Sequence, residues 1–237
     1  MLYLVPTPIG NLGDITLRAL EVLKSADVIA AEDTRHSGLL LKHFGIRKPL
    51  LSYHEHNEAQ RTAELMERLG RGEVVAVVSD AGMPGISDPG ARIVAACREA
   101  GVPLTILPGP SALLTAVVGS GFPAERFYYG GFLPPKSGGR ARELTAANGR
   151  QETSVFFESP HRLLKTLEAA AALLGERPLA VARELSKTFE EYRIGPAREL
   201  LAHYTAHPPR GEIVLLIRGH DDREWRRLIR ERDKNAR

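Results

Sequence analysis

Three short segments of the chain bring carboxylates, histidines and cations together within a few residues. They are residues 32–36 (EDTRH), residues 52–58 (SYHEHNE) and residues 183–191 (RELSKTFEE). A carboxylate or a neutral histidine can accept the proton of a hydroxyl group near neutral pH, and a fixed cation can stabilise the resulting oxyanion. These groups therefore suit a reaction in which a substrate oxygen loses its proton as it attacks.

Asp33 and His54 are the side chains that we expect nearest to the reacting oxygen, because each follows a predicted strand in the first half of the chain. Asp33 would orient or deprotonate the hydroxyl, and Arg35 would hold a neighbouring phosphate. The position of Asp33 equally predicts a cap for a helix that begins at Thr34. Lys187 is either a base with a lowered pKa or a fixed cation, and its sequence context leaves both roles open.

A metal centre is not expected from these clusters. Residues 54–56 (HEH) have the right chemistry for a metal ion, but successive residues of a strand point to opposite faces of a sheet. Cys97 is the only cysteine, so a single chain cannot form a disulfide, a cysteine-based zinc site or an iron–sulfur cluster. Cys97 lies in an apolar helical pattern, which predicts a core position.

Segments rich in glycine and proline follow four predicted strands, where open α/β sheets bind their ligands. The first, residues 6–14 (PTPIGNLGD), invites comparison with a dinucleotide-binding fingerprint, since Glu32 and Asp33 follow about 20 residues later. It has no GxGxxG pattern, and Pro6 and Pro8 lack the N–H groups that a pyrophosphate needs. The segment therefore favours a ligand without phosphate and argues against a Rossmann oxidoreductase.

The other three segments differ in how strongly they indicate a site. Residues 79–90 (SDAGMPGISDPG) combine glycines, two prolines and two aspartates, which indicates a loop that brings bare backbone close to a ligand. Residues 107–117 (LPGPSALLTAV) suit a structural turn as well as a binding loop, with Ser111 as a helix cap. Residues 156–164 (FFESPHRLL) look like an ordinary helix start that also carries Glu158, His161 and Arg162.

Hydrophobic periodicity predicts two α/β domains. In the first domain, residues 1–129, strands are expected at residues 2–5, 28–31, 50–53, 74–78 and 104–107, and helices at 16–25, 39–44, 57–69, 91–100 and 111–118. Short apolar strands that alternate with helices predict a mostly parallel sheet covered on both faces. A smaller mixed domain, residues 141–219, should contain strands at 154–157, 179–183, 189–194 and 212–217 and helices at 162–174 and 197–205.

Two segments lie outside the predicted domains. Residues 130–140 (GGFLPPKSGGR) read as a hinge or, alternatively, as a surface loop within one domain. Residues 220–237 form a charged tail that suits a solvated helix or an anion-binding extension.

The overall composition is that of a soluble globular protein. Of 237 residues, 43% are hydrophobic and 26% charged, and the net charge of +3 permits an anionic partner such as RNA without demonstrating one. No apolar run approaches the roughly 20 residues needed to span a bilayer. The first residues lack the basic region of a signal peptide. We therefore expect a cytoplasmic location and no membrane partner.

Seven motifs in a fixed order carry a resemblance to a known family. They are VPTPIGNLGDIT, AEDTRHS, VSDAGMPGISDPG, LPGPSALLTA, FFESPHRL, RELSKTFEE and PRGEIVLLI. Together they strongly resemble the tetrapyrrole methylase superfamily, and within it the branch that methylates a ribose 2′-oxygen of small-subunit ribosomal RNA. The resemblance covers about residues 1–219.

The resemblance implies two α/β domains with S-adenosylmethionine in the cleft between them, and a homodimer. The implied substrate is a cytidine in the decoding region of 16S rRNA, either free or in the small ribosomal subunit, with no role for DNA. The family's glycine-aspartate-proline loop is altered here to Ser79, Asp80, Ala81 and Gly82. The implied cofactor contacts are Pro8, Gly10, Asp80, Ala81, Ile86, Ser87, Gly109, Ser111, Phe157 and Gly211.

RNA contacts are expected from cations in and after the hinge. The candidates are Lys136, Arg140, Arg142 and Arg162. Arg35, Arg162 and Lys187 could hold RNA phosphates or form ion pairs at a domain interface. Two other functions remain open on the same fold, namely methylation of a corrin-type tetrapyrrole and RNA binding without catalysis.

Overall fold

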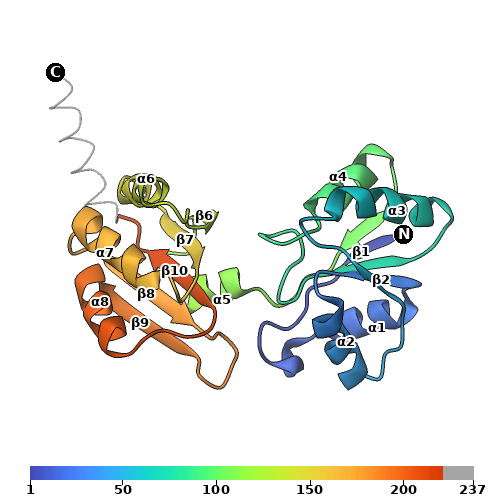
Figure 1. Cartoon of the computed structure of the whole chain (residues 1–237), viewed down its shortest axis with the longest axis horizontal. Coiled ribbons are helices and arrows are strands. Elements are labelled where there is room, and N and C mark those ends of the chain that lie inside the picture. Colours follow the sequence, from blue (N-terminus) through green and yellow to red (C-terminus); the bar gives the residue numbers. More distant parts are fainter. Residues whose placement is uncertain (221–237) are drawn as a thin grey trace. The chain divides into compact units, whose positions relative to one another are not determined.

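The computed structural model describes residues 1–220, which divide into two compact units (Figure 1). The first unit is Met1–Ser111, and the second begins at Ala112. Throughout the described part of the chain, the helices are too short or too polar to cross a membrane.

The first unit is a five-stranded parallel sheet with helices on both faces. Its strands, in the sheet order β3-β2-β4-β1-β5, are β1 (Leu2–Leu4), β2 (Val28–Ala31), β3 (Leu50–Ser52), β4 (Val75–Val78) and β5 (Leu104–Ile106). Its helices are α1 (Leu17–Ser25), α2 (Thr34–His43), α3 (Glu58–Gly70) and α4 (Ala91–Glu99), with a 3-10 turn at Leu12–Asp14. Figure 1 shows α1 and α2 on one face of the sheet and α3 and α4 on the other.

Alternation along the buried strands builds one core on each face of this sheet. In β2, Val28 belongs to the cluster that contains Leu65 of α3, whereas Ile29 belongs to the cluster that contains Leu23 of α1. Cys97 is fully buried in the α3–α4 cluster, so its predicted core position is confirmed. The parallel sheet with covered faces is the arrangement that the alternating strands and helices predicted.

The second unit is a mixed five-stranded sheet in the order β6-β7-β10-β8-β9. Its strands are β6 (Phe127–Phe132), β7 (Thr153–Glu158), β8 (Pro178–Arg183), β9 (Glu191–Pro196) and β10 (Ile213–Ile217). Its helices are α5 (Ala112–Gly119), α6 (Ser137–Asn148), α7 (Leu163–Leu174) and α8 (Ala197–Ala206). Strands β6 and β7 are parallel and the other neighbours antiparallel. Side chains of α6, α7 and α8 share one apolar cluster with the sheet, and α5 contacts β10.

The predicted hinge at residues 130–140 is wrong, because this segment contains the end of β6 and the first turn of α6. Its first glycine is required for packing: a Cβ at Gly130 would lie 2.3 Å from Cε1 of Phe156, which is fully buried. The division between the units instead falls after Ser111, so α5 and β6 belong to the second unit and not to the first. Apart from His220, the predicted charged tail lies outside the described residues.

Candidate active site

All strands of the first sheet are parallel, so the segments that follow them leave the sheet at the same edge. Three of these segments contain predicted site residues: residues 6–14 after β1, residues 79–90 after β4, and residues 107–111 after β5. The carboxyl ends of β2 and β3 add the acid–base candidates. This edge is the place where open α/β sheets bind ligands.

Backbone hydrogen bonds fasten the loop after β4 to the loop after β1. Thr7 N–H donates to the Gly82 carbonyl at 2.9 Å, and Gly82 N–H donates to the Thr7 carbonyl at 3.0 Å. The Thr7 hydroxyl donates to the Ser79 carbonyl at 3.0 Å, and the Ser79 hydroxyl donates to the Gly82 carbonyl at 3.1 Å. Asp80 and Ala81 are thus held between two fixed anchors.

Two glycines, Gly82 and Gly109, allow these loops to lie close to each other. Gly82 has φ +83°, and a Cβ there would lie 3.3 Å from Cγ2 of Ile9 and 3.7 Å from the Pro110 carbonyl. A Cβ at Gly109 would lie 2.8 Å from Cβ of Pro6. The loops after β1, β4 and β5 therefore pack closely against one another because Gly82 and Gly109 lack a Cβ.

Ser87 and its neighbours form the far part of the loop after β4. Ser87 has φ +60°, which is unusual for a residue with a side chain and is found most often at binding sites. Gly90 N–H donates to Glu58 Oε1 at 3.1 Å, and that oxygen also accepts from the Tyr53 hydroxyl at 3.1 Å. Glu58 therefore connects the end of the loop with α3 and with the residue after β3. Neither Glu58 nor Tyr53 was among the residues selected from the sequence.

Residues that follow β2 and β4 interact with each other, and two of them, Glu32 and Asp80, carry carboxylates. Asp33 N–H donates to Asp80 Oδ1 at 3.0 Å, and Glu32 lies near enough to Asp80 for their carboxylates to interact electrostatically. Burial raises the pKa of Glu32, and the negative charge of Asp80 raises it further. The sequence placed Glu32 in a cluster of candidates without selecting it.

Asp33 caps helix α2, as one of the two sequence interpretations predicted. Its Oδ1 accepts from the Arg35 N–H at 2.8 Å, and its carboxylate forms an ion pair with the Arg35 guanidinium at 2.7 Å. The hydrogen bond from the Arg35 side chain is the main reason that the pKa of Asp33 is lowered. A carboxylate in this state is a weak base, which favours the capping role. Arg35 is highly exposed but is paired with Asp33.

His54 lies directly beyond β3 and is held by Asn57. The His54 N–H donates to Asn57 Oδ1 at 2.8 Å, and the Asn57 amide nitrogen is 3.2 Å from His54 Nε2. Among the described residues, the buried Nδ1 of His54 has no hydrogen-bond partner. Within residues 1–220, no group of three or more His, Cys, Asp or Glu side chains is arranged to hold a metal ion.

Lys187, in the second unit, is a fixed cation rather than a base. Its Nζ lies 2.9 Å from Glu184 Oε1 and 2.9 Å from Glu212 Oε2. Burial lowers the pKa of Lys187, but the hydrogen bonds with both carboxylates outweigh it, so that the pKa is raised overall. Of the two roles that the sequence left open, the geometry favours the cation.

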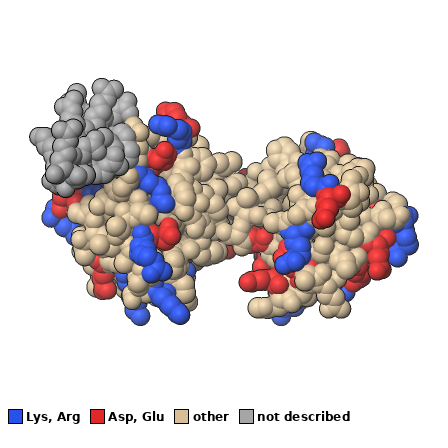
Figure 2. Space-filling view, turned by 90° about the horizontal axis from the view of Figure 1, so that it is seen from above, with Lys and Arg blue, Asp and Glu red and all other residues tan. Residues whose placement is uncertain are grey.

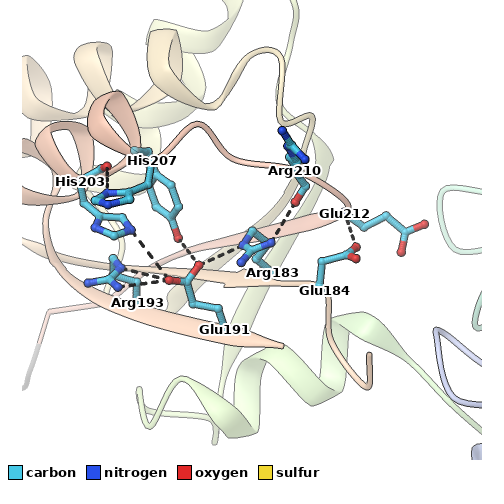
Figure 3. Close-up of polar contacts among 9 residues, drawn as sticks. Arg183, Glu184, Glu191, Arg193, His203, His207, Arg210 and Glu212 are labelled. Carbon is cyan, nitrogen blue, oxygen red and sulfur yellow. Dashed lines mark hydrogen bonds and ion pairs between the residues drawn. The ribbon is translucent and has the colours of Figure 1, made fainter. Parts of the chain in front are cut away.

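The backbone around this cation is strained. Glu184 and Ser186 have φ +52° and +65°, which is unusual for residues with side chains, whereas Gly211 adopts φ +79° without strain because it has no Cβ. A Cβ at Gly211 would lie 2.1 Å from Glu184 Oε1, so only glycine lets the Glu184 carboxylate lie against this backbone. Figure 3 shows Glu184 beside Glu212, whose N–H donates to it at 3.1 Å.

A second charged group in Figure 3 connects β8, β9 and α8. Glu191 accepts from Arg183 at 3.0 Å and from the Tyr204 hydroxyl at 3.2 Å, and it forms an ion pair with Arg193 at 3.2 Å. Although burial alone would raise the pKa of Glu191, the hydrogen bond from Arg183 and the other donors lower it. Its partners all belong to the second unit, which indicates a structural role.

The predicted residues around β7 also have mostly structural surroundings. Arg162 forms an ion pair with the buried Glu158 at 2.8 Å and donates to the Leu133 carbonyl at 3.1 Å. Phe157 packs edge to face against Tyr129 and Phe132, with ring centroids 5.4 Å apart in both pairs. The guanidinium of Arg162 is therefore already occupied by contacts within the protein, which argues against a role in binding phosphate.

The predicted RNA-binding cations near α6 differ in exposure. Arg140 is only 7% exposed, and its Nη1 donates to the Pro135 carbonyl at 3.3 Å, so a surface contact by Arg140 is not supported. Lys136 and Arg142 are exposed. Helix α6 begins without a side-chain cap, which leaves backbone N–H groups of its first turn available.

The fold and the arrangement at the sheet edge define a class of methyltransferases. Residues 1–201 match the sequence profile of the Tetrapyrrole (Corrin/Porphyrin) Methylases. A diphthine synthase structure superimposes with a TM-score of 0.73 at 16% identity, covering 92% of this chain and 91% of that chain. A uroporphyrin-III-C-methyltransferase from Thermus thermophilus gives 0.63 at 24% identity, covering 91% and 93%. These structural similarities support the two-domain fold of the class.

Sequence relatives narrow the class to one family. A ribosomal RNA small subunit methyltransferase I from Escherichia coli O157:H7 is 53% identical over 94% of this chain and 79% of that protein. Proteins of the same name from Synechocystis and Bacillus subtilis are 49% and 46% identical, over 92% and 94% of this chain and 79% and 77% of their own lengths. The chain belongs to the ribosomal RNA small subunit methyltransferase I family.

Proposed function

We propose that this protein transfers a methyl group from S-adenosylmethionine to the ribose 2′-oxygen of a cytidine in the decoding region of 16S rRNA. The observation that carries the proposal is the identity of 46–53% with ribosomal RNA small subunit methyltransferases, over more than nine-tenths of the chain. The position of the methylated oxygen rests on the motif resemblance of the sequence.

The loops at the carboxyl edge of the first sheet fit the proposed cofactor. S-adenosylmethionine carries amine, carboxylate and hydroxyl groups but no phosphate, and the three loops come close together at Gly82 and Gly109, which have no Cβ. The prolines of residues 6–14 exclude a phosphate cradle of the usual kind. We propose that Pro8, Gly10, Asp80, Ala81, Ile86, Ser87, Gly109 and Ser111 contribute to this binding surface.

The chain's own residues would hold the reactants and manage one proton. When bound, the cofactor supplies an activated methyl group on a sulfonium. The fixed loops then align the hydroxyl with that group, and alignment of this kind supplies at best about 7–11 kcal/mol of the barrier. A carboxylate at the edge of the first sheet would take the hydroxyl proton, and Lys187 would stabilise negative charge on the bound RNA.

For RNA binding, we favour the exposed cations at the start of α6, although the segment is not a hinge. Lys136 and Arg142 are exposed there, and free N–H groups at a helix start attract phosphate. On the face seen in Figure 2, the second unit shows several Lys and Arg side chains with acidic side chains among them. Arg140 would support this segment from beneath through its bond to Pro135.

We further propose that the protein acts as a homodimer in the cytoplasm. Exposed apolar side chains support association: Leu114 and Val118 of α5 are 53% and 75% exposed, and they lie one helical turn apart. Light scattering coupled to size-exclusion chromatography tests this proposal, and a monomer at micromolar concentration contradicts it.

The function is tested by offering the purified protein three acceptors with tritiated S-adenosylmethionine: small ribosomal subunits, free 16S rRNA and a corrin-type tetrapyrrole. We expect label in RNA, mapped by mass spectrometry to one cytidine ribose. Binding should also stabilise the fold, by about 2.7 kcal/mol at a hundredfold excess over the dissociation constant. Label in the corrin alone would replace the RNA function, and stabilisation by NAD but not by S-adenosylmethionine would exclude a methylase.

A further inference from the structure

Three neighbouring strands of the first sheet bring a histidine and two carboxylates to one place. Strand β2 lies between β3 and β4, and its last residue, Ala31, is in register with Ser52 and with Val78. Glu32 follows Ala31 directly, His54 follows β3 by two residues, and Asp80 follows β4 by two residues. Glu32 therefore lies in the middle of this edge, next to the loop that carries the predicted cofactor contacts.

Glu32 differs from most other carboxylates near strand ends because it lacks a cationic partner. Asp33 pairs with Arg35, Glu158 with Arg162 and Glu184 with Lys187. Across residues 1–220, no lysine, arginine or histidine lies within ion-pair distance of Glu32. It is half-buried and lies beside Asp80. The Glu32 carboxylate therefore remains available to react with a substrate, because no ion pair within residues 1–220 holds it.

We infer that Glu32 is the catalytic residue that accepts the proton of the substrate hydroxyl, an inference that rests on the proposed methyltransferase function. The hydroxyl oxygen forms its bond to the methyl carbon while the O–H bond breaks and the proton passes to a Glu32 carboxylate oxygen. The carbon–sulfur bond breaks at the same time, and its electron pair stays on sulfur. One negative and one positive charge become a neutral acid and a neutral thioether, so the step is balanced.

The surroundings of Glu32 favour this role electrostatically. Burial and then the Asp80 carboxylate raise its pKa, Asp33 raises it further, and the Asp80 N–H and His54 act in the opposite direction. A raised pKa makes Glu32 a stronger base than Asp33, whose pKa is lowered by Arg35.

The test compares Glu32→Gln with a matched control, Glu73→Gln. Glu73 precedes β4 at the opposite edge of the same sheet and pairs with Arg68 and Arg71. Cofactor affinity is measured by calorimetry, and single-turnover methylation of small subunits is measured from pH 5 to pH 9. We expect E32Q to bind the cofactor within a few-fold of the parent and to methylate about 10²–10⁴-fold more slowly. E73Q should match the parent in both.

The pH dependence separates a proton acceptor from a structural group. Because the base acts when ionised, the parent's rate should rise with pH through the pKa of Glu32 and then level off, and E32Q should lose this rise. A second variant, Glu32→Asp, keeps a carboxylate and should recover part of the rate, which covers the case of an unfolded E32Q. An E32Q rate near that of the parent, or a loss confined to cofactor affinity, overturns the inference. Absence of methylation by the parent itself would instead refute the proposed function.

Discussion

The carboxylates at the strand ends of the second unit are paired with cations, as Asp33 is in the first unit, whereas Glu32 of the first unit is not paired within the described residues. In the second unit, Glu158, Glu184 and Glu191 each contact a lysine or arginine, and each joins two or more elements. At the carboxyl edge of the first sheet, Glu32 instead faces Asp80. A carboxylate that forms no ion pair contributes less to the stability of the fold than a carboxylate that is paired with a lysine or arginine. The contrast therefore separates charges that hold the fold from a charge that is available for chemistry.

The buried pair of the second unit should show the largest stability effect. Glu158→Gln leaves Arg162 without its charged partner and weakens the bond from the Thr166 hydroxyl, which is now 2.6 Å long. Breaking a buried ion pair costs roughly 3–5 kcal/mol, and the partial exposure of Arg162 predicts the lower part of that range. Urea unfolding measures the loss.

The matched control for this prediction is Glu176→Gln. Glu176 pairs with Arg198 at 2.9 Å, but both side chains are about two-thirds exposed, so a change below about 1 kcal/mol is expected. Equal losses in the two variants would mean that burial does not distinguish these pairs.

Sequence patterns predicted elements far better than they predicted partners. Apolar runs and helical spacing predicted the strands and helices of both units except β6 and α6, because burial of alternate or fourth residues produces these patterns. The segment at residues 130–140 failed, because Gly130 is a glycine that Phe156 requires, and no local pattern reports such a distant neighbour.

At the candidate site too, the sequence predicted local contacts but not contacts between residues that are distant in the chain. Position before a helix correctly predicted that Asp33 is a cap. The sequence could not show that Glu32, its neighbour, faces Asp80 across two strands that are 47 residues apart in the chain, since that depends on strand order. Lys187 was recognised, but its raised pKa depends on Glu212, which is distant in sequence.

Lys187 tests whether a paired charge of the second unit can also take part in the reaction. If Lys187 also acts on bound RNA, Lys187→Gln should lower kcat/KM about 10²–10³-fold, as for other groups that stabilise developing negative charge. Because its pKa is raised, the lysine stays protonated and the pH profile should keep its shape. Lys165→Gln, on the exposed face of α7, is the control. A loss of stability without a loss of rate would make Lys187 a structural cation like Arg162.

Gly82 tests whether the close approach of the loops in the first unit serves binding. Gly82→Ala places a side chain at φ +83° and 3.3 Å from Ile9, and such strain costs about 1–3 kcal/mol. We expect cofactor affinity to fall about tenfold or more, measured by calorimetry. Gly72→Ala has the same strain, with φ +87° and no neighbour within 4 Å, at the other edge of the sheet. It should lower stability and leave affinity intact; equal affinity losses would contradict a role of the loop.

Asp33 gives the smallest expected effect and the most direct comparison with its neighbour Glu32. Asp33→Asn keeps a side-chain acceptor for the Arg35 N–H but removes the ion pair, so the melting temperature should fall by only a few degrees and the methylation rate by no more than a few-fold. Since Arg35 lowers the pKa of Asp33, the stabilisation is complete above the ordinary pKa of about 3.9 and is lost as the pH falls from there toward the lower folded value. Parent and variant should therefore differ at pH 7, and the difference should begin to shrink only as the pH falls below about 4. They should also converge at 1 M salt, because the pair is exposed. A rate loss of about 10²–10⁴-fold in Asp33→Asn, with cofactor affinity unchanged, would transfer the role of proton acceptor from Glu32 to Asp33.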